Sequence, residues 1–422
     1  RDAQESRGLG DVYKRQTAVY QNSRLANINL SWEASGMNNL GIDLAFLGGR
    51  VTFSADWYRK STKDLLAMEQ IPSEMGVSNM RVNLGSIRNE GFELTASGYP
   101  IRNRNFSWQT GFNISFNKNK ITKLEGGTAY LEGGRYWIEE GGPIGQWYGY
   151  KYLGIYATDE ANAYIKNADN SFGERLTPIY ERDPNNYNNW VYGSDGKPKF
   201  SHYETPDGKV YEGEIGQMRA NNTVAKGGDV IWEDTNHDGV IGDSDRQVLG
   251  NAVPTTYYGW QNTFSYKNFT LSFSFYGSLG NKIYNQMRRN LNQFSSSNYT
   301  SLSRDCRNLW KYQGQQTYLY AGTNATQGVN NGRELSSFYL EDGDYIRLDN
   351  IRLTYRMDKR WAAKFMASEF NVYVYAKNIA MWTNYSGFDP SNISNSNPLQ
   401  PGTDNGRYPR SKEFGFGINL NF

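Results

Sequence analysis

The sequence predicts an all-β protein: an antiparallel, up-and-down transmembrane β-barrel with long extracellular loops. Three observations lead to this prediction. Apolar and polar residues alternate with a period of two in many segments, as they do in half-buried strands. Aromatic residues make up 15% of a chain that is only 38% hydrophobic, which is typical of a barrel with a wet inner face. Short turns between some predicted strands contrast with very long connections between others.

The alternating segments begin with a hairpin around Gly48-Gly49. Leu40–Phe46 and Val51–Trp57 flank this turn, and each places its apolar residues on one face. The pattern recurs up to the last segment, Phe414–Phe422, where a wholly apolar face lies opposite glycine and asparagine. We expect roughly a dozen strands of about 9 to 11 residues, the length that a tilted strand needs to cross a bilayer.

Composition and charge exclude several classes of function. The 45 Lys and Arg residues are interspersed with 43 Asp and Glu residues, so the sequence has no basic block of the kind that binds nucleic acid. A single cysteine, Cys306, rules out an internal disulfide, and two histidines leave little basis for a His-dependent catalytic triad. No run of about 20 apolar residues predicts a membrane helix, and no signal peptide is recognisable. We therefore expect that the protein is not an enzyme.

The chain divides into a short leader and one long barrel portion. Residues 1–16 carry no usable period and are expected to be a disordered or non-native leader. Residues 17–422 form the predicted barrel portion, with long loops at about 126–148, 159–255 and 281–338. Structureless connections of this length are uncommon in compact domains and are usually functional.

Aromatic residues are frequent in the long loops. Tyr187, Trp190 and Tyr192 are candidate ligand-binding residues, because such side chains stack on sugar rings or peptides at a low cost in conformational entropy. The alternative is that these residues only pack the loops against one another. For any one of them, packing is the commoner role.

The sharpest local motif runs from Asp234 to Asp245 and matches the calcium-loop pattern D-x-[DN]-x-[DN]-G with an acid at position twelve. The predicted Ca²⁺ ligands are Asp234, Asn236 and Asp238, the carbonyl of Val240, and Asp245. No amphipathic helices flank the segment, so the ion would act as a structural clip inside a long loop. The alternative is a turn rich in Asp and Asn that holds no metal.

Two other charged clusters have structural interpretations. Glu341 and Asp342, with Asp344, have the chemistry of acid–base catalysis, but solvation of a turn is the commoner role and the one we expect. Arg347 and Arg352 alternate with apolar residues in a predicted strand, so we expect both to line a polar lumen.

With these motifs in place, the chain resembles the C-terminal half of SusC/RagA-type TonB-dependent outer-membrane transporters of Bacteroidetes. The resemblance covers nearly everything after about residue 20, in the order found in the family. The segments that carry it include Asn83–Glu93, Gly142–Tyr156, Gly228–Pro254, Leu340–Ile351 and Tyr385–Pro390.

This resemblance implies an outer-membrane location and a barrel of about 22 strands around a plug. It also implies a SusD-like cap lipoprotein, the TonB–ExbB–ExbD complex acting through the plug, and a cargo of oligosaccharides or peptides. The terminal Phe422 resembles the aromatic residue that the barrel-assembly machinery recognises. Nutrient import is the function that the resemblance implies.

The departures from the family define the alternatives. We expect the plug domain to be absent, and a dozen strands would leave two sheet edges that hydrocarbon does not tolerate. The sequence by itself is therefore expected to be an incomplete barrel that transports nothing. Two other functions stay open: a surface barrel with an adhesive or structural role and no TonB energy, and a secreted β-sandwich that acts on glycans.

Overall fold

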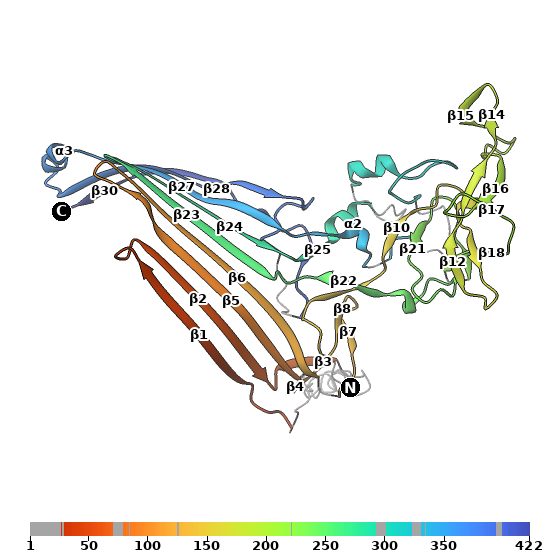
Figure 1. Cartoon of the computed structure of the whole chain (residues 1–422), viewed down its shortest axis with the longest axis horizontal. Coiled ribbons are helices and arrows are strands. Elements are labelled where there is room, and N and C mark those ends of the chain that lie inside the picture. Colours follow the sequence, from red (N-terminus) through yellow and green to blue (C-terminus); the bar gives the residue numbers. More distant parts are fainter. Residues whose placement is uncertain are drawn as a thin grey trace, which may run out of the picture.

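A computed structural model describes the chain in two parts, a wall of long strands and a layer of short strands at one end of that wall (Figure 1). The predicted leader, residues 1–16, lies outside the described residues. No helix in the described part of the chain is both long and apolar enough to cross a membrane. The structure describes residues 27, 29–70, 79–83, 85–124, 126–220, 222–292, 301–322, 331–333, 335–393 and 399–422.

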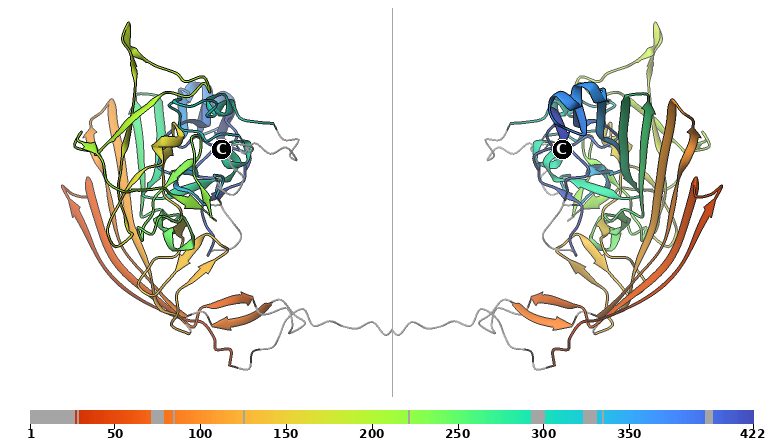
Figure 2. Two further views of the ribbon diagram at one scale, coloured as in Figure 1. Left: turned by 90° about the vertical axis from the view of Figure 1, so that its right-hand side faces the viewer. Right: turned by 90° about the vertical axis from the view of Figure 1, so that its left-hand side faces the viewer.

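The wall is one antiparallel sheet of nine strands in the order β1-β2-β5-β6-β23-β24-β27-β28-β30. Figure 2 shows it as a curved arc. This confirms the predicted fold class, and because the long strands form a single sheet, it does not fit the sandwich alternative. The strands are β1 (Ala34–Phe46), β2 (Val51–Lys63), β5 (Gly85–Arg102), β6 (Phe106–Leu124), β23 (Thr256–Tyr266), β24 (Phe269–Leu279), β27 (Tyr345–Arg356), β28 (Glu369–Thr383) and β30 (Glu413–Asn421).

Nine strands in the described wall are fewer than the dozen that the alternation predicted. The difference arises because short strands elsewhere carry the same alternation without joining the wall. Several wall strands also exceed the predicted length, up to 19 residues in β6. Such strands extend past the thickness of the bilayer's hydrocarbon core, which about 9 to 11 tilted residues span.

Tight turns join the wall strands at the end opposite the layer (Figure 1). Gly48 and Gly49 have φ angles of 64° and 84°, so the predicted β1–β2 turn uses the left-handed conformation that glycine adopts without strain. Lys267, with a φ of 53°, makes the predicted turn between β23 and β24. A short helix, α3 (Lys359–Lys364), lies between β27 and β28. The predicted asymmetry between short turns and long connections is therefore confirmed.

The wall exposes its apolar face. In β30, Phe414, Phe416 and Ile418 are 72%, 81% and 60% exposed. The alternating Gly415 and Gly417 lie against the rings of Tyr375 and Tyr373 on β28. A soluble sheet would cover such an apolar face, whereas a barrel presents it to lipid.

Two long connections build most of the second part, which we call the loop layer. One joins Leu124 of β6 to Thr256 of β23, and the other joins Leu279 of β24 to Tyr345 of β27. The predicted loops 126–148 and 159–255 are one connection, because the strand between them, β10 (Tyr152–Ile155), pairs with β21 (Val230–Trp232) inside the layer and not with the wall. The third predicted loop, 281–338, lies within the other connection. The segment between β28 and β30 joins this layer, because its strand β29 (Thr403–Asp404) pairs with β25 (Lys282–Asn285).

The remaining elements are mostly short. The first connection contains β7 (Tyr130–Glu132), β8 (Tyr136–Ile138), β9 (Gln146–Gly149), η2 (Asp159–Ala161), β11 (Tyr164–Lys166), β12 (Phe172–Arg175), β13 (Thr177–Tyr180), β14 (Arg182–Asp183), β15 (Asn186–Trp190), β16 (Phe200–Glu204), β17 (Val210–Tyr211), β18 (Ile215–Gly216), β19 (Arg219–Ala220), β20 (Thr223–Val224), η3 (Asp243–Asp245) and β22 (Gln247–Asn251). The second contains β25 (Lys282–Asn285), α2 (Gln286–Asn292), η4 (Arg304–Asn308), η5 (Ser337–Tyr339) and β26 (Leu340–Asp342). Elsewhere are β3 (Leu66–Gln70), β4 (Asn79–Asn83) and β29 (Thr403–Asp404).

The loop layer has an aromatic core of its own. Trp147 is fully buried, its ring stacks on Tyr136 with centroids 4.5 Å apart, and its indole donates a hydrogen bond of 2.9 Å to the carbonyl of Lys282. A second cluster gathers Tyr156, Trp232 and other apolar residues from both connections. The connections are thus packed protein, and they hold polar side chains in fixed positions beside the wall.

Candidate functional site

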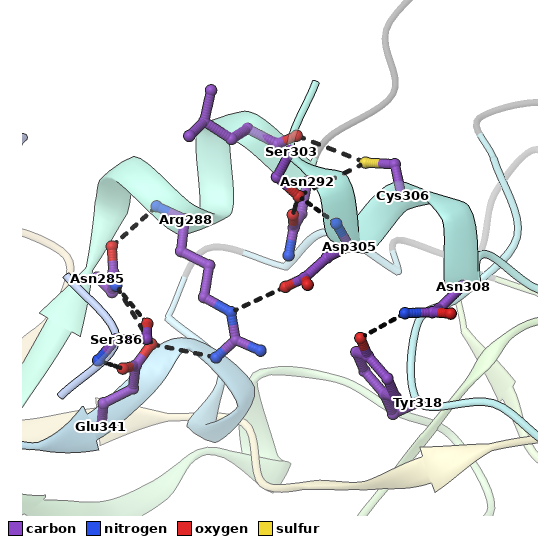
Figure 3. Close-up of polar contacts among 11 residues, drawn as sticks. Asn285, Arg288, Asn292, Ser303, Asp305, Cys306, Asn308, Tyr318, Glu341 and Ser386 are labelled. Atoms are coloured by element: carbon purple, nitrogen blue, oxygen red, sulfur yellow. Dashed lines mark hydrogen bonds and ion pairs between the residues drawn. The ribbon is translucent and has the colours of Figure 1, made fainter. Parts of the chain in front are cut away.

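A cavity of about 690 Å³ lies where α2, β26 and the segment after β28 meet. Figure 3 shows the polar side chains that converge there from elements far apart in the sequence. The lining residues are Asn285, Met287, Arg288, Leu291, Ser303, Asp305, Leu340, Glu341, Asp342, Asn384, Ser386, Gly387, Phe388 and Asp404.

Arg288 is the central cation of this cavity. Its Nη1 donates to Glu341 Oε1 at 3.1 Å, and its Nε lies 3.7 Å from Asp305 Oδ2. The guanidinium also lies over the ring of Phe338, with its carbon 4.9 Å from the ring centroid. These partners hold the side chain and position its remaining donors, and Figure 3 shows its contacts with Glu341 and Asp305.

Glu341 joins β26 to the segment after β28. Its Oε1 accepts hydrogen bonds from Ser386 Oγ at 2.8 Å and from Asn285 Nδ2 at 3.2 Å. Its Oε2 accepts the backbone amide of Ser386 at 2.8 Å. Asn285 in turn accepts the amide of Arg288 at 2.8 Å, so this nearly buried asparagine also supports the start of α2. The Glu341 carboxylate therefore accepts hydrogen bonds from several segments and holds them together. We had expected it only to solvate a turn.

The helix η4 supplies the opposite side of the cavity. Ser303 caps it by accepting the amide of Asp305 at 3.1 Å, which is the usual role of serine at a helix start. The Ser303 hydroxyl donates to Asn292 at the end of α2, and Cys306 donates to the carbonyl of Leu291 at 3.5 Å. These contacts tie η4 to α2 and place the Asp305 carboxylate beside Arg288.

The cavity is acidic. Of the described residues that line it, four are acidic and one is basic: Asp305, Glu341, Asp342 and Asp404 against Arg288. Two of the four acids have other partners as well, since Asp342 pairs with Lys282 and the buried Asp404 accepts the hydroxyl of Tyr385. Burial, followed by this hydrogen bond to Asp404, raises the pKa of Tyr385. The excess of carboxylates favours uncharged or cationic ligands over anionic ones.

An exposed aromatic ring stands among these polar groups. Phe388 is 64% exposed and lines the cavity together with the apolar Met287 and Leu291. A ring with adjacent hydrogen-bonding groups is the combination that binds an amphipathic ligand such as a sugar or a peptide side chain.

The three aromatic residues singled out from the sequence lie elsewhere. Tyr187 and Trp190 are on β15 in the distal hairpin with β14, and Tyr192 follows it (Figure 1). Trp190 packs against Tyr180 with centroids 5.0 Å apart, while Tyr187 is 78% exposed. None of the three lines the cavity described above. The terminal Phe422 is 84% exposed and follows β30.

The predicted calcium ligands lie together in one loop after β21. Gly239 donates its amide to Asp234 Oδ2 at 2.8 Å. Asp245, which is fully buried, accepts the amide of Thr235 at 3.0 Å and that of Gly242 at 2.7 Å. Burial, together with the charges of Asp245 and Asp238, raises the pKa of Asp234. The loop therefore concentrates carboxylates in a partly buried place.

Side-chain placement in this loop agrees with the expected pattern in two respects. Ile241 is buried as an apolar anchor, and His237 is exposed. No group of three His, Cys, Asp or Glu side chains in the described part of the chain is gathered closely enough to hold a metal ion. Several carboxylate oxygens of the loop accept backbone amides, as they would in an Asx-rich turn without metal. Calcium binding by this loop therefore stays a prediction.

Arg347 and Arg352 share one face of β27, as expected. The strand achieves this with a β-bulge, which simple alternation does not predict. Arg347 pairs with Tyr276 and Arg352 with Ser272, two residues on the same face of β24. An odd spacing of five would put the two arginines on opposite faces. A bulge at Asp349 inserts one residue and restores the shared face.

Arg347 does not line an open lumen. Its side chain is 2% exposed and its Nη2 lies 2.5 Å from Asp389 Oδ1. Asn378 and Ser391 accept further hydrogen bonds from the same guanidinium. The expectation of a solvated lumen residue is therefore wrong for Arg347, because the segment after β28 folds back over the end of β27 and buries it.

The sequence patterns did not predict this cavity. Asn285 and Glu341 are 56 residues apart, and Glu341 and Ser386 are 45 apart, so no local spacing connects them. One signal was available: Glu341-Asp342 and Tyr385–Pro390 both belong to the segments that resemble the transporter family.

Comparisons with known proteins agree with this architecture. The family described as "TonB dependent receptor-like, beta-barrel" matches residues 6–185. TonB-dependent receptor P39 of Formosa agariphila is 34% identical over 401 residues, covering 94% of this chain and 36% of the relative. TonB-dependent receptor SusC of Bacteroides thetaiotaomicron is 28% identical over 422 residues, covering 98% of this chain and 34% of the relative.

The solved structure of the RagAB peptide transporter has a similar fold. The match has a TM-score of 0.67 at 20% identity and covers 94% of this chain and 36% of that one. The chain thus spans about a third of the length of the curated relatives that it matches. It belongs to the SusC/RagA-like TonB-dependent receptors, outer-membrane proteins of the Bacteroidetes, and corresponds to the C-terminal portion of their β-barrel.

Proposed function

We propose that the receptor containing this chain imports nutrients across the outer membrane, and that the cavity at α2, β26 and Phe388 binds cargo. The observation that carries the second part is the convergence of Arg288, Glu341 and Ser386 around a cavity of about 690 Å³. Cavities of this size that combine placed polar groups with exposed apolar side chains are typical ligand sites. The proposed activity is transport and not catalysis.

The cargo class follows from the charges. Four acidic side chains against one guanidinium favour neutral or cationic oligosaccharides or peptides and disfavour polyanions. The proposed partners are those of the family: a SusD-like lipoprotein over the loop layer, and the TonB–ExbB–ExbD complex acting through a plug. We also propose that the barrel-assembly machinery recognises the exposed Phe422 at the end of the last strand.

Uptake by whole cells that carry the complete receptor tests this proposal. Three fluorescent probes of similar length are compared: a neutral gluco-oligosaccharide, a lysine-rich peptide and a glutamate-rich peptide. Energised cells should accumulate at least one of the first two and exclude the third. Dissipating the proton-motive force should abolish accumulation. Phe388→Ala should lower apparent affinity roughly tenfold, the factor that corresponds to about 1.4 kcal/mol of binding free energy.

Tyr187→Ala is the matched control, because it removes an exposed aromatic ring from the distal hairpin. If Tyr187→Ala lowers uptake and Phe388→Ala does not, the cargo site is on the hairpin and the cavity proposal fails. If cells bind a probe without energy-dependent accumulation, the adhesive alternative replaces transport. Preferred uptake of the glutamate-rich peptide would contradict the charge argument alone.

A further inference from the structure

The loop from Asp234 to Asp245 has the backbone arrangement of a twelve-residue calcium loop. Gly239 stands at position six with a φ of 75°, the sharp turn for which such loops use glycine. Its amide donates to Asp234 Oδ2 across the loop, which brings position one and position six together. The amides of Asp238 and Val240 donate to the side chains two residues before them, at 3.2 Å and 2.7 Å. Successive side-chain oxygens are therefore turned back toward the loop.

One oxygen in this loop is left over. Asp234 is 7% exposed, and while its Oδ2 accepts the amide of Gly239, its Oδ1 is buried and has no hydrogen-bond partner. Among the ion pairs of the described residues, none joins a Lys or Arg side chain to Asp234, Asp238 or Asp245. A buried carboxylate oxygen without a donor or a counter-charge is costly. A cation at this position would remove that cost.

The geometry points to a Ca²⁺ site in which Asp234 Oδ1 is the first ligand. Asn236, Asp238, the carbonyl of Val240 and Asp245 complete the oxygen ligands that the loop offers. This inference does not depend on the proposed cargo or on transport.

Two of the proposed ligands are exposed side chains of this loop. Asn236 and Asp238 are exposed, and the Nδ2 of Asn236 donates to Asp238 Oδ2 at 2.9 Å. This contact shows that the two side chains already converge. In the proposed site, these two exposed side chains turn their oxygens toward Asp234. Calcium tolerates six to eight oxygens in flexible geometry, whereas magnesium demands a near-ideal octahedron, so calcium is the better fit.

The ion would fasten several segments of the loop layer. The carbonyl of His237 accepts the amide of Phe172, and the carbonyl of Gly239 accepts the amide of Arg219 at 3.0 Å. Arg333 donates to the carbonyl of Ile241 at 3.0 Å. These three contacts reach β12, β19 and the segment before β26. An ion that fixes the Asp234–Asp245 loop would therefore also stabilise strands that lie far from this loop in the sequence.

Terbium luminescence of the complete receptor in detergent tests this site. Tb³⁺ is a calcium substitute, and Trp232, two residues before Asp234, is close enough to sensitise its emission. We expect Tb³⁺ emission on tryptophan excitation, its displacement by Ca²⁺, and a higher unfolding temperature in Ca²⁺ than in chelator. Asp234→Asn should weaken Ca²⁺ binding at least about tenfold, since affinity in such loops follows the number of charged ligands.

Asp243→Asn is the matched control. Asp243 lies in the same loop at position ten, outside the ligand set, and bonds to Tyr150 and Arg246. The proposal is overturned if the wild-type receptor shows neither Tb³⁺ emission nor a Ca²⁺-dependent unfolding temperature. It is also overturned if Asp243→Asn weakens binding as much as Asp234→Asn. Should Asp234→Asn fail to fold, the wild-type comparison between Ca²⁺ and chelator still decides.

Discussion

The wall and the loop layer use the same aromatic residues in opposite ways. In the wall, Phe416 on β30 is 81% exposed and belongs to an apolar face that meets lipid. In the loop layer, Trp147 is fully buried against Tyr136 and Tyr284. The wall thus takes its apolar environment from the membrane, while the loop layer has to build one from its own side chains. Exposure of an aromatic ring therefore has a different meaning in each part.

The largest expected effect is in the loop layer. Trp147→Ala removes the ring at the centre of a packed cluster and should cost about 3–5 kcal/mol, the range for large-to-small changes in a closed core. Trp361→Ala on α3 is the matched control, because that ring is 51% exposed. Thermal unfolding in detergent measures both variants. Equal losses would mean that the layer has no core of its own.

The next effect concerns the wall and distinguishes its two faces. Phe273 and Ser274 are neighbours on β24, and Phe273 belongs to the apolar face while Ser274 belongs to the other. Phe273→Arg should cost about 2–4 kcal/mol if it lies near the midplane of the bilayer, whereas Ser274→Arg should cost far less because lumen positions tolerate charge. Folding into lipid vesicles against denaturant measures the difference. If Ser274→Arg destabilises the protein more than Phe273→Arg, the assignment of the lipid face and the lumen face is wrong.

The smallest effect lies at the junction of the two parts. Burial raises the pKa of Asp389, but hydrogen bonds from Ser391 and from Arg347, with the charge of that guanidinium, outweigh burial and hold the pKa below its usual value. A lowered pKa contributes stability that is complete above the ordinary aspartate pKa of about 3.9 and is lost as the pH falls from there through the lowered value.

The measurement is the unfolding temperature of the wild type and of Asp389→Asn between neutral pH and strong acid. The wild type should lose part of its advantage over the variant as the carboxylate is protonated. A constant difference between the two proteins across this range would show that the Arg347–Asp389 pair does not set the acid stability.

Local patterns were enough to predict most of the wall. The β1–β2 hairpin follows from alternation around Gly48-Gly49, and the β23–β24 turn follows from Lys267-Asn268. The loop layer resisted such reasoning. The Tyr152–Ile155 segment has the composition of a strand, yet it pairs with β21 inside the layer. Alternation of apolar and polar residues predicts a strand with two different faces, but it does not predict which sheet that strand joins.

The candidate site was predicted only in part, for a similar reason. The Asp234–Asp245 motif is contiguous, so its candidate ligands could be chosen from their spacing alone, and calcium binding there stays a prediction. The cavity takes Arg288, Glu341 and Ser386 from three segments, and their proximity depends on how the layer packs. The partner of Arg347 was missed for the same cause, since Asp389 is 42 residues away in the chain.

The bulge at Asp349 also limits how this strand can vary in length. Deleting one residue between Arg347 and Arg352 would reduce their spacing to four, so a regular strand without the bulge would keep both side chains on the same face. Inserting one residue there, with the bulge kept, would place one of the two on the lipid side. Among natural variants of this strand, the loss of one residue here should therefore coincide with the loss of the bulge.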